Sequence, residues 1–149
     1  MHLVLPCLAE FALAFIATLG FGLLFNVPRR TLLPCGVVGG VGRMVRSIAV
    51  AAGASVAGGT YIGALAIAVL GYVLARKFES PRMVFTVTGV IPMIPGVPAF
   101  STLLEFADGN VTAGMAYAVE TMLITGALAM GLTTVRVLSR VPNRSSDSV

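Results

Sequence analysis

Five long apolar segments occupy most of the sequence. They cover residues 3–25, 31–52, 57–75, 83–104 and 113–138. A transmembrane helix needs about 20 mainly apolar residues. Only 11% of the residues are charged, against about a quarter in soluble domains, so the segments cannot be the core of a water-soluble fold. We predict an all-α integral membrane protein with about five transmembrane helices, forming one domain over residues 1–149 with a disordered tail at 141–149.

The basic residues between the segments indicate an orientation. Lys and Arg occur in the links after the first and third segments and in the tail, at Arg29, Arg30, Arg76, Lys77, Arg82, Arg136, Arg140 and Arg144. The links at 53–59 and 105–112 contain neither. Five spans place all basic regions on one side, which the positive-inside rule makes cytoplasmic. We therefore expect the N-terminus outside and the C-terminus inside.

The fourth apolar segment is interrupted at its middle. Its stretch VIPMIPGVPAF, residues 90–100, carries Pro92, Pro95 and Pro98 at intervals of three, with Gly96 among them. Each proline lacks an N–H, so the carbonyl four residues earlier loses its helical donor. Irregular backbone at membrane depth lies inside protein or beside a water-filled cavity, and broken helices form binding sites in transporters. We predict a break whose core, Pro92, Pro95 and Gly96, binds substrate; the alternative is a kink that only shapes packing.

Four charged residues lie inside the apolar segments: Glu10, Arg43, Arg46 and Glu120. Each costs about 2.5–3.5 kcal/mol at the centre of a membrane helix, so such residues face the protein interior, pair with each other or serve transport. Arg43 and Arg46 are three residues apart and share a helix face. Two guanidinium groups on one face suit a carboxylate, which arginine binds in a bidentate manner. We predict that Arg43 and Arg46 bind substrate; the alternative is that they only form structural ion pairs with Glu10 and Glu120. The two glutamates are also candidates for proton coupling.

Glycines recur at intervals of four in two segments. Gly36 and Gly40 form one GxxxG motif, and Gly59 and Gly63 form another. This spacing lets the backbones of membrane helices approach closely. We favour packing within the chain over a subunit interface, although the two roles are compatible.

Several functional classes lack support in the sequence. It contains no G-x-S-x-G, H-E-x-x-H or phosphate-binding motif. The single histidine is terminal, and Cys7 and Cys35 have no metal-binding spacing. The net charge of +4 is typical of basic cytoplasmic loops and does not indicate nucleic-acid binding. We expect no enzyme activity, catalytic residue, metal or other cofactor.

Several of these stretches together resemble one family of membrane proteins. They are FNVPRRTLLPC, then GxxGGxGRMVR, then VFTVTGVIPMIPG after a basic link, spanning residues 21–100. They resemble the threonine/serine exporter family, and in particular its small split-subunit branch. Pro92, Pro95 and Gly96 coincide with the family's proline-glycine motif, and Arg46 with a basic position. Arg43 coincides with a position where another member differs, and Pro98 is less general.

The resemblance implies a bacterial protein of the cytoplasmic membrane that acts with a partner. Fused members of the family join two membrane halves in one chain, whereas split members provide them as a larger and a smaller subunit. Fused members export threonine and serine, and a split pair in enteric bacteria is associated with succinate export. An odd number of spans is consistent with half of an inverted repeat. We predict a subunit of an exporter of small carboxylates, paired with a larger paralogous subunit or a second copy; the alternatives are a non-transporting scaffold subunit and a small channel.

Overall fold

The computed structural model describes residues 4–139, and every regular element in that range is helical. The elements are α1 (Val4–Leu24), α2 (Arg29–Ala51), α3 (Val56–Lys77), α4 (Arg82–Val90), the 3₁₀ turn η1 (Ile91–Met93), α5 (Gly96–Ala107) and α6 (Val111–Leu138). Each lies within a few residues of a predicted segment, so the all-α membrane fold is confirmed. Four helices are long and apolar enough to cross a membrane, and the bent pair α4–η1 and α5 can supply a fifth span. The tail predicted at 141–149 lies outside the described residues.

The helix boundaries follow from short polar and proline-containing turns. Asn26 adopts the left-handed backbone conformation (φ 54°) between α1 and α2, which asparagine tolerates better than most residues. Pro28 and Pro81 immediately precede α2 and α4. The Ser55 hydroxyl caps α3 by accepting the N–H of Gly58, and the Asn110 side chain caps α6 by accepting that of Ala113. Local sequence therefore determines where most of the helices begin.

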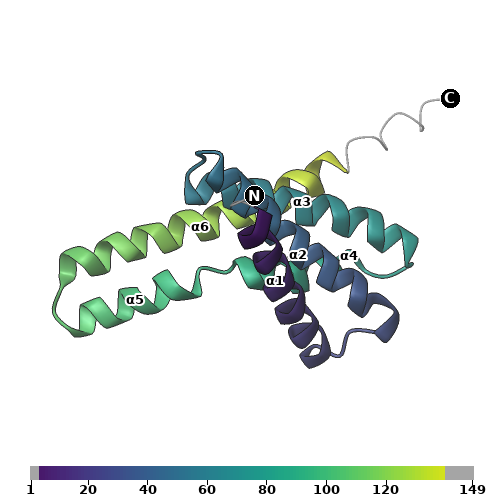
Figure 1. Cartoon of the computed structure of the whole chain (residues 1–149), viewed down its shortest axis with the longest axis horizontal. Coiled ribbons are helices and arrows are strands. Elements are labelled where there is room, and N and C mark those ends of the chain that lie inside the picture. Colours follow the sequence, from purple (N-terminus) through teal and green to yellow (C-terminus); the bar gives the residue numbers. More distant parts are fainter. Residues whose placement is uncertain (1–3, 140–149) are drawn as a thin grey trace.

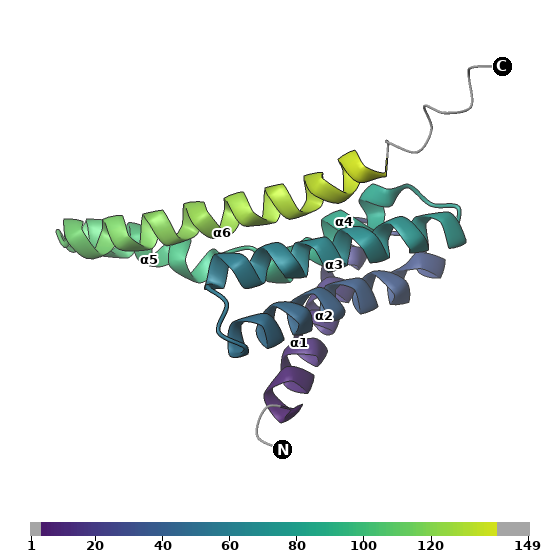
Figure 2. The same ribbon diagram turned by 90° about the horizontal axis from the view of Figure 1, so that it is seen from above.

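The helices α1 to α4 and the C-terminal part of α6 form a bundle with α2 between α1 and α3 (Figures 1 and 2). Glycines allow the backbones to approach. A Cβ added at Gly36 or Gly40 would contact Phe15 or Phe11 of α1 at 2.7 Å. One added at Gly63 would lie 2.7 Å from the Gly42 carbonyl oxygen. Both GxxxG motifs thus pack helices within the chain, as we favoured from the sequence.

The remaining part of the molecule is an arm made of α5 and the N-terminal part of α6. The arm extends beyond the turn that joins α2 to α3 (Figures 1 and 2). None of the α5 residues is buried, and α5 makes its main contacts with α6. Gly114 of α6 packs against Phe106 of α5, whereas Gly131, farther along α6, packs against Ala64 in the bundle. The long helix α6 therefore joins two differently packed regions.

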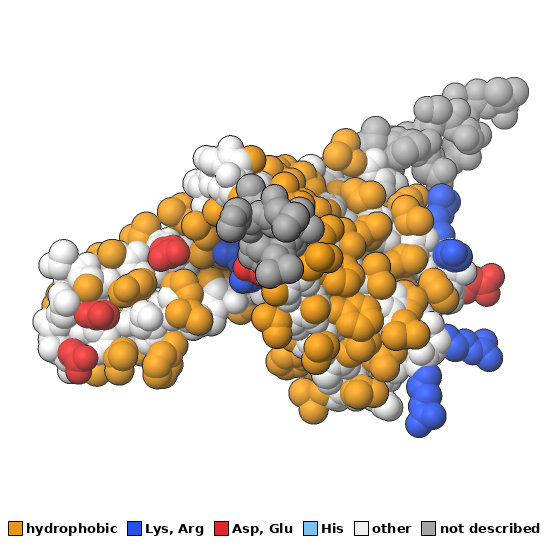
Figure 3. All heavy atoms as spheres, viewed as in Figure 1, with side chains coloured by type: hydrophobic (Ala, Val, Ile, Leu, Met, Phe, Trp, Pro, Cys, Tyr) orange, Lys and Arg blue, Asp and Glu red, His pale blue; other side chains and the backbone are white. Residues whose placement is uncertain are grey.

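Apolar side chains are spread over the face shown in Figure 3, and many large apolar side chains are exposed, as in a protein that contacts lipid. Many of the threonine hydroxyls in α5 and α6 donate to the carbonyl four residues earlier in their own helix, at Thr102, Thr121, Thr125, Thr133 and Thr134. Lys and Arg side chains gather at one end of the molecule, and acidic side chains mark the arm (Figure 3). The end with the α1–α2 and α3–α4 turns carries the basic residues of the predicted cytoplasmic side.

Candidate functional site

Arg43 and Arg46, in the C-terminal half of α2, have different surroundings. The Arg43 Nε donates to Glu10 Oε2 of α1 at 2.6 Å, and both side chains are about one-third exposed (32% and 34%). Arg46 forms no ion pair with any residue between 4 and 139. Glu120, from α6, lies within electrostatic reach of Arg46. Only one of the two guanidinium groups thus has a carboxylate directly bound.

The predicted interruption of the fourth span is short and sharply defined. Residues Ile91–Met93 form a 3₁₀ turn, only Ile94 and Pro95 lie outside a helix, and the axis bends by 48°. Two of the carbonyls that the proline spacing predicts to be free find local donors. The Ile91 carbonyl accepts the N–H of Ile94 at 3.2 Å, and the Ile94 carbonyl accepts that of Gly96 at 2.8 Å. The break is thus a compact turn rather than a long unwound loop.

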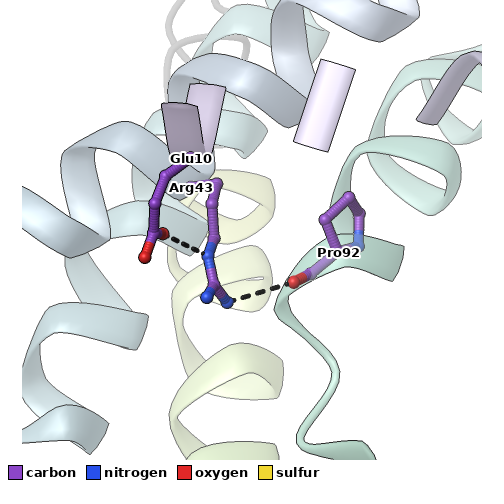
Figure 4. Close-up of polar contacts among 3 residues, drawn as sticks. All are labelled: Glu10, Arg43 and Pro92. Atoms are coloured by element: carbon purple, nitrogen blue, oxygen red, sulfur yellow. Dashed lines mark hydrogen bonds and ion pairs between the residues drawn. The ribbon is translucent and has the colours of Figure 1, made fainter. Parts of the chain in front are cut away.

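A side chain of α2 contacts the break directly. The Arg43 Nη1 donates to the carbonyl oxygen of Pro92 at 3.2 Å, so a single guanidinium group bonds to Glu10 and to Pro92 (Figure 4). The arginine and the break lie far apart in the sequence but meet at one depth in the bundle. Two of the four charged residues inside the apolar segments, Glu10 and Arg43, are therefore linked to the helix break.

A cavity of about 150 Å³ lies beside this contact, lined by Glu10, Arg43, Arg46, Ser47, Val50 and Val56. Drug-sized ligands occupy pockets of roughly 300–1,000 Å³, so this volume suits a much smaller molecule. Val50 and Val56 belong to the ends of α2 and α3, which places the cavity toward the turn between these helices. Its lining combines two cations, one carboxylate, one hydroxyl and apolar walls.

A threonine/serine exporter family model (Threonine/Serine exporter, ThrE) matches residues 10–138. The chain belongs to the threonine/serine exporter family. The family consists of membrane exporters, which agrees with the apolar helices described above. The match includes every predicted site residue, from Glu10 to Glu120. No solved structure matches the chain.

The exporter's predicted site residues are only partly brought together. Glu10, Arg43 and Arg46 line the cavity. Pro92 is not part of the lining, but its carbonyl oxygen accepts a hydrogen bond from Arg43. Pro95 and Gly96 are absent from its lining; Pro95 is buried and Gly96 is exposed. Substrate contact by these two residues stays a prediction. Pro98 lies in the first turn of α5, as expected from its place after the break.

Two features of the site escaped the sequence analysis. Ser47 lines the cavity because it follows Arg43 by four residues and shares its helix face; that spacing could have identified it. The Pro92 carbonyl was also missed, because its availability depends on the turn at Pro95 and not on proline spacing alone. Within residues 4–139, no cluster of His, Cys, Asp and Glu could hold a metal ion.

Proposed function

We propose that this chain is a subunit of a secondary exporter of small carboxylates and that the cavity on α2 is its substrate site. The observation that carries the proposal is Arg46, a half-buried guanidinium that lines the cavity without an ion-pair partner between residues 4 and 139. A charge inside a membrane protein is costly and marks a functional site by default. Arginine binds a carboxylate through two parallel hydrogen bonds. A substrate carboxylate therefore supplies the partner that Arg46 lacks.

The mixture of charges in the cavity favours a zwitterionic amino acid over a dicarboxylate. The three charged lining groups are Arg43, Arg46 and Glu10. An amino acid places its carboxylate on Arg46 and its ammonium near the Glu10 carboxylate, while a hydroxyl side chain can bond to Ser47. A dicarboxylate such as succinate would bring its second negative charge toward Glu10. Like charges at short range in a poorly screened site oppose binding.

The same carboxylates offer a route for coupling to protons. Glu10 is bound to Arg43, and Glu120 approaches Arg46. A substrate carboxylate that binds Arg46 competes with these glutamates for the positive charge of the guanidinium group. We propose that one of these two glutamates carries a proton opposite to the exported substrate. We expect export to depend on a proton gradient. The double variant Glu10→Gln/Glu120→Gln should lose this dependence.

The orientation and the partner complete the proposal. The basic end faces the bacterial cytoplasm, with the N-terminus outside and the C-terminus inside. The open arm supports a partner, because no α5 residue is buried by the chain itself. The partner is a larger paralogous subunit of opposite orientation, which together with this chain forms an inverted repeat. Failure of the chain to co-purify with such a subunit, and of its own copies to associate, would contradict this part.

Transport by the purified exporter in liposomes tests the substrate. Labelled threonine, serine and succinate are loaded, and efflux is measured with and without a proton gradient. We expect saturable efflux of threonine and serine, with succinate transported at least about tenfold less efficiently, which corresponds to 1.4 kcal/mol in transition-state binding. A scaffold subunit predicts that the partner alone supports the full rate. A channel predicts flux that neither saturates nor responds to the proton gradient.

A further inference from the structure

The break in the fourth span creates a backbone acceptor that needs a donor from elsewhere. In a continuous α-helix the Gly96 N–H would reach the Pro92 carbonyl. Here Pro95 (φ −77°, ψ 61°) has the geometry of an inverse γ-turn, and the Gly96 N–H donates to Ile94 instead. Water is scarce at membrane depth, so a released carbonyl must find its donor in the protein.

Arg43 supplies that donor while it also binds Glu10. Its Nη1 reaches the Pro92 oxygen at 3.2 Å, and its Nε reaches Glu10 Oε2 at 2.6 Å. The two bonds use different nitrogens of one planar group and point to different elements, η1 and α1 (Figure 4). A lysine ammonium on a flexible stem lacks this fixed fork. Three elements, α1, α2 and η1, thus meet at one guanidinium.

The packing on either side of the break makes this junction important for the bend. The half before the break is held in the bundle, where Phe85 is fully buried and Gly89 contacts Val38 of α2. The half after the break has no buried residue and packs mainly on α6. The Arg43 bond to Pro92 is a polar tie from the bundle to the point where the two halves diverge. The direction of α5 therefore depends on this tie.

We infer that Arg43 is a positioning residue that fixes the bend of the broken span by linking Glu10 of α1 to the Pro92 carbonyl, whereas Arg46 alone binds the substrate carboxylate. The second half of this inference rests on the proposed function. The first half concerns only the shape of the empty protein.

Distance measurements between spin labels test the first half without substrate. Labels are placed on the exposed positions Val87 of α4 and Leu103 of α5, after replacing the native cysteines Cys7 and Cys35 with serine. The full chain is studied in lipid nanodiscs by pulsed electron spin resonance. We expect Arg43→Gln to shift or broaden the distance distribution, because the Pro92 carbonyl loses its donor from α2.

Arg46→Gln is the matched control, since it removes the same charge from the same helix face. It should leave the distribution unchanged. An unchanged distribution in Arg43→Gln, or the same change in both variants, would overturn the inference. If Arg43→Gln does not fold because Glu10 is left unpaired, Arg43→Lys is measured instead. The lysine keeps a positive charge for Glu10 but lacks the second nitrogen that bonds to the Pro92 carbonyl. An unchanged distance distribution in Arg43→Lys, or the same change in Arg46→Gln, would overturn the inference.

Transport kinetics test the division between the two arginines. We expect Arg43→Lys to lower the maximal rate of threonine efflux about tenfold while KM stays within about twofold, as for a residue that acts on a conformational step. Arg46→Lys should raise KM about tenfold or more through loss of bidentate binding. A raised KM in Arg43→Lys together with an unchanged KM in Arg46→Lys would instead identify Arg43 as the residue that binds the substrate carboxylate. A spectroscopic effect without any threonine flux would refute the proposed substrate and leave the positioning role of Arg43 intact.

Discussion

The bundle and the arm are both built from apolar helices, but they are packed in different ways. In the bundle, glycines bring backbones together, so that an added methyl group at Gly63 would meet the Gly42 carbonyl of the neighbouring helix. In the arm, by contrast, no α5 residue is buried. The cavity lined by Arg43 and Arg46 belongs to the bundle. The difference indicates that the bundle holds the site in place, whereas the arm is available to a partner or to lipid.

The largest expected difference between the two regions is in transport. Arg46→Gln removes a guanidinium from the cavity and should lower kcat/KM for threonine about a hundredfold, because a charge-assisted bidentate pair is lost. Glu105→Gln changes a charge on the arm and should stay within about twofold of the parent. Efflux from liposomes that contain equal amounts of each variant measures both. A similar loss in the two variants would mean that the site extends into the arm.

The effect of an added methyl group on stability should differ between a glycine at a packed helix contact and a glycine with open space around it. Gly63→Ala places a Cβ 2.7 Å from the Gly42 carbonyl and 2.7 Å from the Met93 methyl group. We expect it to lower the free energy of unfolding by about 1–3 kcal/mol, the usual range for overpacking. Gly126→Ala meets no atom within 4 Å and should raise helix stability by up to about 1 kcal/mol. Thermal unfolding in detergent compares the two, and a loss of stability in Gly126→Ala would contradict the open space around Gly126.

A smaller effect is expected at the basic end of the bundle. The guanidinium groups of Arg82 and Arg76 lie 4.3 Å and 5.3 Å from the centre of the Tyr72 ring. Each exposed cation–π contact is worth about 0.5–1 kcal/mol. Tyr72→Leu should therefore lower the free energy of unfolding by about 1 kcal/mol more than Tyr117→Leu, its counterpart on the arm. Chemical denaturation measures both variants. Equal losses of unfolding free energy in the two would mean that Arg76 and Arg82 do not stabilise the protein through Tyr72.

The smallest effect is expected at the boundary between the regions. Gly96 begins α5 with ordinary backbone angles, and a Cβ there would meet no atom within 4 Å. Gly96→Ala should change the free energy of unfolding by less than about 0.5 kcal/mol. Threonine efflux should also be unchanged if Gly96 stays outside the site. A strong loss of efflux from a stable protein would restore Gly96 as a substrate-binding residue, which is its role according to the sequence motif.

Much of the fold could be predicted from the sequence because membrane spans depend on local composition and length. The break followed from Pro92 and Pro95, since a missing N–H acts on the same helix. Pairing of Arg43 with Glu10 was foreseeable as one of few ways to neutralise a charge in lipid. The arm was not predicted, because its position depends on the direction of the 48° bend. The contacts that accompany this bend, from Arg43 to the Pro92 carbonyl and from α5 to α6, join residues far apart in the chain, and no periodicity in the sequence records them.

The threonines of α6 have a consequence for how this helix enters the membrane. Thr121, Thr125, Thr133 and Thr134 each turn the hydroxyl toward a carbonyl of the preceding turn, which leaves the γ-methyl group as the outward part of the side chain. A hydropathy scale counts these residues as polar, yet the insertion machinery would encounter a largely hydrocarbon cylinder. The last span can therefore enter the lipid with these hydroxyl groups already hydrogen-bonded within the helix.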